Sequence, residues 1–143
     1  MAKKLSSSTL IQLVLNSFEA ERTNNIEDGL ALIHPDFTKT SMLKSDGVVF
    51  PVLESKRVRQ AVTVAYKVEG REFYIFNTAA NEDSQTVFIE LAEREPRVSG
   101  DVLWPYVLVC VIEDGKILRT RHYGDPSLLQ EVVTIDQIKE VVE

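Results

Sequence analysis

The fold is decided by residues 103–123, near the end of the chain, which read LWPYVLVCVIEDGKILRTRHY. Two apolar runs flank Asp114-Gly115, the dipeptide that most strongly favours a two-residue type I′ hairpin turn. We therefore predict antiparallel strands over Leu103–Ile112 and Ile117–Tyr123. The first strand is apolar on both faces, whereas a sheet with one solvated face alternates apolar and polar residues. We therefore expect something to cover each face of this strand.

Two more strands precede this hairpin, and helical patterns precede those. Phe73–Ala79 and Thr86–Glu93 are predicted strands, so the chain has four consecutive antiparallel strands. A further strand, over Asp36–Lys44, lies among the helices. Four helices are predicted from apolar periodicity and capping residues. The first has about three turns from Thr9, and the second is shorter, with Asn24 or Asn25 as its cap and His34-Pro35 as its end. The third covers Ser55–Val68, and a short terminal helix covers 134–142. Segregated helices and strands indicate an α+β domain with helices packed on one face of a sheet.

Length and composition limit the classes of protein that need to be considered. The 143 residues suit a single domain, 1–143, with its core over about 9–125. The net charge is −6, so a basic surface for nucleic acid or an anionic membrane is not expected. No apolar run is long enough to span a bilayer, and no signal peptide is recognised, so we expect a cytoplasmic protein. The histidines are His34 and His122, the one cysteine is Cys110, and no cofactor or metal is predicted.

The order of elements resembles the nuclear-transport-factor-2-like superfamily, which includes the SnoaL-like polyketide cyclases, ketosteroid isomerase and limonene-epoxide hydrolase. The D-G-K-I turn at 114–117, followed by Tyr123 and Asp125, resembles the family's last hairpin. Residues 33–37, IHPDF, stand where the family carries an acidic pair. The resemblance implies a cystatin-like cone, in which a curved antiparallel sheet wraps around N-terminal helices and leaves an apolar pocket in its mouth.

The resemblance also implies which chemistry this chain lacks. The base of ketosteroid isomerase falls at Ser41, and its second acid falls at Val107 or Leu108, so neither required carboxyl group is present. The Asp-Arg-Asp set of limonene-epoxide hydrolase cannot be placed on this sequence. The acid/base position of the SnoaL-like cyclases, five residues past Ile117, is occupied by His122, and histidine transfers protons near pH 7.

Strand parity gives an independent expectation for His122. A two-residue turn at Asp114-Gly115 places Val107 opposite His122, so these residues share a face with Val109 and Thr120. The candidate catalytic residues are His122 and Asp36, and Asp36 is a candidate because the resemblance places it where the family carries its acidic pair. The candidate ligand-binding residues are Val107, Val109, Thr120, Glu90, Trp104 and Tyr66. A one-residue slip in register would reverse the face.

Each candidate also has a purely structural interpretation. His122 could be a hydrogen-bonded histidine at a strand end, and Asp36 could be a turn acceptor. Glu90 could pair with an arginine on a neighbouring strand. Trp104 and Tyr66 could belong to the core, as most aromatic side chains do.

These observations lead to a functional hypothesis. We expect a SnoaL-like domain that binds a small apolar metabolite in the cone pocket, as a cyclase, isomerase or hydratase with His122 as acid/base. The alternative is a noncatalytic ligand-binding or protein-interaction domain of the same fold. Because the strand over Leu103–Ile112 is apolar on both faces, we also expect a homodimer through the sheet face, with Tyr106 and Leu108 near the interface.

Overall fold

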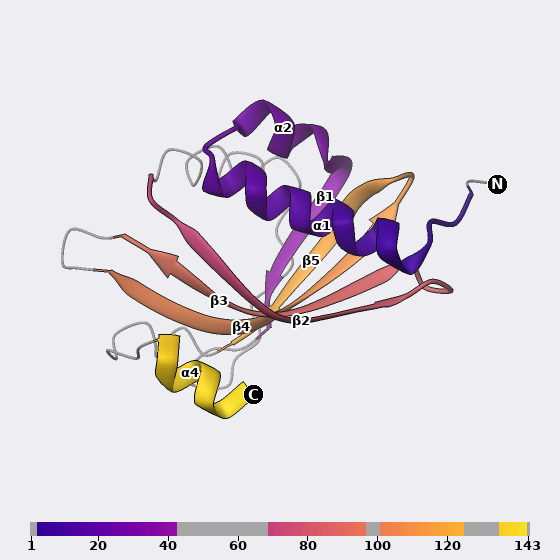
Figure 1. The fold of residues 1–143 in the computed structure, drawn as a ribbon. Coiled ribbons are helices and arrows are strands. Elements are labelled where there is room, and N and C mark those ends of the chain that lie inside the picture. Colours follow the sequence, from indigo (N-terminus) through magenta and orange to yellow (C-terminus); the bar gives the residue numbers. More distant parts are fainter. Residues whose placement is uncertain (1–2, 43–68, 97–100, 125–134, 143) are drawn as a thin grey trace.

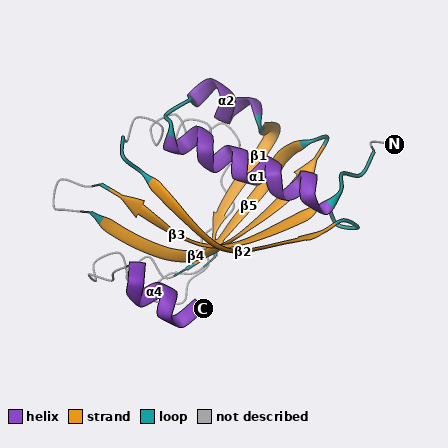
Figure 2. Cartoon of the chain, viewed as in Figure 1, coloured by secondary structure: helices purple, strands orange, loops and turns teal. Residues whose placement is uncertain are grey.

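The structure, a computed structural model, describes residues 3–42, 69–96, 101–124 and 135–142. Its elements are α1 (Ser7–Arg22), α2 (Ile26–Ala31), β1 (Ile33–Ser41), β2 (Glu72–Asn81), β3 (Thr86–Glu95), β4 (Val102–Glu113), β5 (Lys116–Tyr123) and α4 (Ile135–Val142). The strands form one curved sheet in the order β1-β5-β4-β3-β2, with α1 and α2 on one side and α4 on the other (Figures 1 and 2). The helix predicted over Ser55–Val68 lies outside the described residues.

The two N-terminal helices begin at residues that cap them. The Ser6 side chain accepts a hydrogen bond from the Thr9 backbone N–H, so α1 begins before Thr9, the predicted start. A serine at this position satisfies one of the N–H groups that the first turn leaves unpaired. The Asn25 side chain caps α2 in the same way through the Asp28 N–H, which confirms one of the two predicted caps.

Strands β2 to β5 form the predicted antiparallel series, and β1 pairs parallel to β5 at the edge of the sheet. Asp114 and Gly115 both have positive φ, 52° and 69°, as a type I′ turn requires. The prediction that His34-Pro35 ends a helix is wrong, because β1 begins at Ile33 and contains both residues. An edge strand tolerates Pro35, whose nitrogen has no hydrogen to donate.

The predicted register of the last hairpin is wrong by one residue beyond its turn. Ile112 pairs with Ile117 as expected, but Val111 pairs with Arg119, so a bulge leaves Leu118 without a partner. Leu108, and not Val107, therefore lies opposite His122.

This register sorts the side chains between two faces of the sheet, and we name the one packed against α1 the helix-covered face. It carries Trp104, Tyr106, Leu108, Cys110, Thr120 and His122. Val107 and Val109 lie on the opposite face.

The core fills the space between α1 and the helix-covered face. Leu10, Val14 and Phe18 of α1 pack there with apolar side chains of all five strands, and β2 contributes the partly buried Phe73 and Ala80. Tyr106 and Leu108 are both 5% exposed in this core, so the prediction that they lie at a dimer interface is wrong. The opposite face is partly covered in its turn, because Val109 is buried and Ile138 of α4 is buried on that side (Figure 1). Among the described residues, no helix is long and apolar enough to cross a membrane.

Candidate functional site

A buried network of charged groups connects α1 to the helix-covered face. Arg71, just before β2, donates through Nε to Glu93 Oε1 at 3.0 Å, and its Nη2 contacts the same oxygen. Its Nη1 lies 2.9 Å from Oε2 of Glu21 on α1. The Tyr106 hydroxyl donates to the other oxygen of Glu93 at 2.9 Å. One guanidinium thus lies between two carboxylates, and Tyr106 extends the network toward the middle of the sheet.

Burial controls the protonation of this network. It raises the pKa of the Glu21 carboxyl, against the opposing effect of the Arg71 guanidinium. Burial alone would lower the pKa of Arg71, but Glu21 and Glu93 outweigh it and raise the pKa. Burial and then the charge of Glu93 raise the pKa of Tyr106 well above its ordinary value. Tyr106 therefore stays a neutral hydrogen-bond donor at physiological pH.

Next to this network, three rings form a stack on the helix-covered face. The centroids of Trp104 and Tyr106 are 4.4 Å apart, and those of Tyr106 and His122 are 5.2 Å apart. The Trp104 and His122 rings are nearly parallel, at 11°, with centroids 6.0 Å apart. The chain passes this stack at Gly124, where a Cβ would lie 2.8 Å from Tyr106 Cβ and 3.0 Å from Trp104 Nε1. Only glycine fits there without displacing a ring.

Polar atoms of this stack and of the neighbouring Thr120 form no hydrogen bond. Trp104 Nε1, His122 Nδ1 and Thr120 Oγ1 are buried and have no hydrogen-bond partner in the part of the chain that the structure describes. Burial, together with the positive charge of Lys39, lowers the pKa of His122 well below its ordinary value. The imidazole is therefore neutral at pH 7, with one nitrogen free to accept a proton. Buried polar atoms without partners call for an explanation, and a bound ligand is one.

The structure brings together only part of the predicted site. Thr120 and Trp104 share the helix-covered face with His122. Val107 and Val109 lie on the opposite face because of the bulge at Leu118.

The remaining predicted residues lie elsewhere. The Asp36 side chain is 86% exposed and lies by His34. Glu90 accepts a hydrogen bond from Asn77 at 2.9 Å, and its Cα partner is Val107 on the face away from α1. Tyr66 lies outside the described residues. Glu90 therefore lies on the opposite face from His122, and the exposed Asp36 lies by His34.

Four charged residues of the site were not predicted from the sequence: Glu21, Lys39, Arg71 and Glu93. Glu93 carried a signal, because it continues the alternation of Val87, Ile89 and Leu91, which places a carboxylate on the apolar face of its strand. A charged side chain on the buried side of a strand requires a partner of opposite charge or a hydrogen-bonding group. The partner itself is not apparent from the sequence, because the pairing of β2 with β3 brings Arg71 next to Glu93.

A second group of ionisable residues lies at the turn between β4 and β5. His34 Nε2 is 3.7 Å from Glu113 Oε2 and 3.8 Å from Asp114 Oδ2, so the three side chains could reach one cation. The carboxylates are 58% and 66% exposed. His34 Nδ1 already accepts a hydrogen bond from the Asp36 N–H. Solvent screens the charges of the two carboxylates. The group lies near the Ile33–Ile117 pair, at the opposite end of β5 from His122.

Comparison with known proteins identifies the fold. No protein-family model matches the sequence, and no curated protein matches it. Among solved structures, an LEH-like epoxide hydrolase from M. tuberculosis superposes with a TM-score of 0.71 at 18% identity, covering 86% of this chain and 87% of that one. TerC, co-crystallised with polyporic acid, gives 0.64 at 18% identity, covering 86% and 96%. An NTF2-like protein from Cytophaga hutchinsonii gives 0.61 at 17% identity, covering 92% and 100%.

These similarities define the class of fold. The chain has the cystatin-like, nuclear-transport-factor-2-like fold that the sequence predicted, built as a curved sheet with N-terminal helices on one face. Because this fold carries unrelated activities, the activity of this protein has to be argued from the residues of its own site.

Proposed function

We propose that this protein binds a small, mostly apolar molecule with an oxygen function against the ring stack, and that His122 transfers a proton there. The observation that carries the proposal is a neutral imidazole whose buried Nδ1 has no partner among the described residues, beside an indole N–H in the same condition. Ligand sites are mostly apolar with a few polar groups that fix orientation, which is the composition found around His122.

The chemistry that these groups support is proton abstraction next to a carbonyl. The free nitrogen of His122 takes a proton from the carbon beside the carbonyl, and the C–H electron pair becomes a C=C bond. The carbonyl π electrons move onto oxygen, for which the Trp104 N–H is a hydrogen-bond donor. In a conjugated substrate, return of the proton to a different carbon of the enolate completes an isomerisation. Attack of the enolate carbon on a second carbonyl group of the substrate forms the C–C bond of a cyclisation, and the resulting alkoxide takes the proton from His122. A histidine whose pKa lies below neutrality is in the correct protonation state at pH 7.

The solved structures of similar fold support a ligand-binding or catalytic function, but they do not identify the substrate. One is an LEH-like epoxide hydrolase, and TerC was crystallised with polyporic acid, so the fold accommodates small organic molecules and catalysis in other chains. The resemblance argues against a steroid-isomerase mechanism, because Leu108 stands at one of the positions where that enzyme would need a carboxyl group.

The test uses 2-acetylnaphthalene, a planar apolar ketone, dissolved in D₂O with the protein. Proton NMR would follow deuterium exchange of its methyl protons. We expect exchange faster than in buffer with the wild-type protein, and at the buffer rate with His122→Gln, which preserves size and polarity. Binding without accelerated exchange would favour the noncatalytic alternative, and an equal rate for both proteins would remove His122 from the mechanism.

We further propose the homodimer through the face of the sheet that points away from α1. Phe88 and Tyr123 are 42% and 37% exposed, and they pair with Val109 and Val107 on that face. Light scattering after size-exclusion chromatography should give a dimer at micromolar concentration for the wild type and a monomer for Phe88→Glu. A wild-type monomer would contradict this. The cytoplasmic location stays a prediction.

A further inference from the structure

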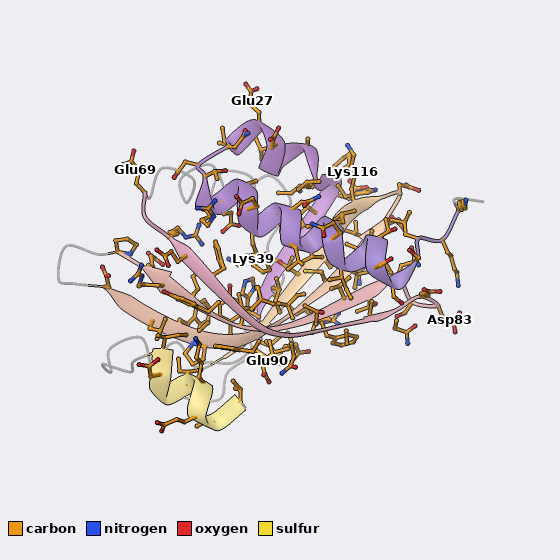
Figure 3. All side chains as sticks on the ribbon, viewed as in Figure 1. Glu27, Lys39, Glu69, Asp83, Glu90 and Lys116 are labelled. Carbon is orange, nitrogen blue, oxygen red and sulfur yellow. The ribbon has the colours of Figure 1, made fainter. Side chains whose placement is uncertain are left out.

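A lysine lies on the helix-covered face beside the proposed base. Lys39 of β1 has Thr120 of β5 as its Cα partner, and the next pair but one along these strands places Ser41 beside His122. Paired residues on adjacent strands point to the same face of a sheet, so the Lys39 side chain shares a face with Thr120 and His122. Lys39 is half-buried, and Figure 3 shows it between α1 and the sheet.

Lys39 lies outside the ion pairs that the described residues of this face form. The Arg71 guanidinium is neutralised by Glu21 and Glu93, and Glu93 has both oxygens engaged, one by Arg71 and one by Tyr106. Lys39 forms no ion pair with any residue in the described ranges. One guanidinium does not offset two carboxylates, and Lys39 interacts at longer range with the Glu21 carboxylate, which Arg71 contacts at 2.9 Å. The ammonium forms no hydrogen bond to the described residues, so its N–H groups are available to an oxygen anion bound beside it.

A second observation points to the same place. Thr120 is 9% exposed, and its hydroxyl has no hydrogen-bond partner among the residues described. This hydroxyl lies on the strand next to Lys39, at the paired position. The Trp104 N–H is a further donor without an acceptor on the same face. The helix-covered face thus carries one ammonium and two further hydrogen-bond donors near His122, and none of them forms a hydrogen bond to a described residue.

We propose that Lys39 selects a ligand that carries an acidic oxygen, such as a carboxylate, an acidic enol or a phenolate, on an otherwise planar apolar frame. This inference rests on the proposed function, because it names the class of molecule bound at the same site. The ammonium holds the oxygen anion, Thr120 and Trp104 donate to it, and the frame lies against the rings of Tyr106 and His122. Where His122 generates an enolate, Lys39 stabilises the charge that forms on its oxygen.

The experiment compares two probes that share one frame, 2-naphthoate and uncharged 2-acetylnaphthalene. Their affinities would be measured by isothermal titration calorimetry and by the fluorescence of Trp104, the single tryptophan. A hydrogen bond to a charged group corresponds to about 10- to 100-fold in affinity. We expect the wild type to bind naphthoate at least about 10-fold more tightly than the ketone. Lys39→Met should lower the affinity for naphthoate far more than that for the ketone, so that the preference is lost, and Lys39→Arg should keep it.

Lys116, an exposed lysine at the start of β5, provides the matched control, and Lys116→Met should leave both affinities unchanged. Circular dichroism and thermal unfolding of each variant establish that it is folded, and the arginine variant keeps the test valid if methionine disturbs the fold. Equal affinities for the two probes in the wild type, or a preference that survives Lys39→Met, would overturn the role of Lys39 while leaving the proposed function in place. Failure of both probes to bind would overturn both proposals.

Discussion

Removal of the Arg71 guanidinium should be among the most destabilising single changes in this protein. The side chain is 10% exposed and neutralises Glu93, which is 8% exposed, and Glu21, which is 26% exposed. Arg71→Met would leave both carboxylates without their cation. Breaking a buried ion pair by removing one partner costs about 3–5 kcal/mol, because an uncompensated charge stays in the protein. That is a large share of the ~5–15 kcal/mol that stabilises a typical domain.

Two further variants divide this loss among its causes, and a third serves as a control. Tyr106→Phe deletes one hydrogen bond of 2.9 Å to the Glu93 carboxylate and should cost about 1.5–3 kcal/mol. Adding Glu93→Gln to Arg71→Met should recover part of the loss, because it removes one unpaired charge. Arg22→Met is the matched control, since Arg22 and Glu19 form an exposed pair at 2.6 Å, and it should leave the free energy of unfolding unchanged.

The assay is urea denaturation at pH 7, followed by circular dichroism and by tryptophan fluorescence, with linear extrapolation to zero denaturant. The two signals should give coincident transitions in each variant. A loss below about 1 kcal/mol for Arg71→Met, or one no larger than that of Arg22→Met, would refute the reasoning. The network would then be solvated, and the carboxylates would not depend on the guanidinium.

Three other predictions follow from the same region. Burial and then Lys39 hold the pKa of His122 well below 6.5, so below pH 6.5 the unfolded chain binds a proton that the native state does not. The free energy of unfolding should therefore fall as the pH drops, by at most about 1.4 kcal/mol per pH unit from this residue. Urea denaturation at several pH values should show this contribution in the wild type and not in His122→Gln. Cys110 is 0% exposed and burial raises its pKa to about 12, so the native thiol should not react with Ellman's reagent at pH 8, and rapid reaction before unfolding would contradict its burial. Gly124→Ala should cost about 1–3 kcal/mol and alter the emission of the single tryptophan, whereas Gly115→Ala, at a turn with open space, should leave that emission unchanged.

The final hairpin could be predicted because its determinants are local. Asp114-Gly115 has the backbone freedom that a type I′ turn needs, and the flanking apolar runs specify the strands. The bulge at Leu118 could not be predicted, because one extra residue in a strand leaves no distinctive pattern. That single residue decides whether Leu108 or Val107 lies opposite His122, so the composition of the site depended on a feature that the sequence does not display.

The charged part of the site was less accessible because it depends on long-range pairing. Arg71 meets Glu93 only after β2 and β3 align, and Glu21 joins them only after α1 packs on the sheet. Lys39 reaches the site because β1 pairs parallel to β5, which are distant in sequence. His122 could be proposed from resemblance alone, but its neutral state and the unpartnered nitrogen could be recognised only with these neighbours in place.

The central claim is that a small molecule binds against the Trp104–His122 stack. The most direct measurement is the ¹H–¹⁵N NMR spectrum of the labelled protein during titration with 2-acetylnaphthalene, observing the indole N–H of the single tryptophan. We predict a saturable shift of that cross-peak, and a weaker apparent affinity in His122→Ala, which shortens the stack. A cross-peak that stays fixed while calorimetry shows the probe binding would place the ligand elsewhere and contradict the account.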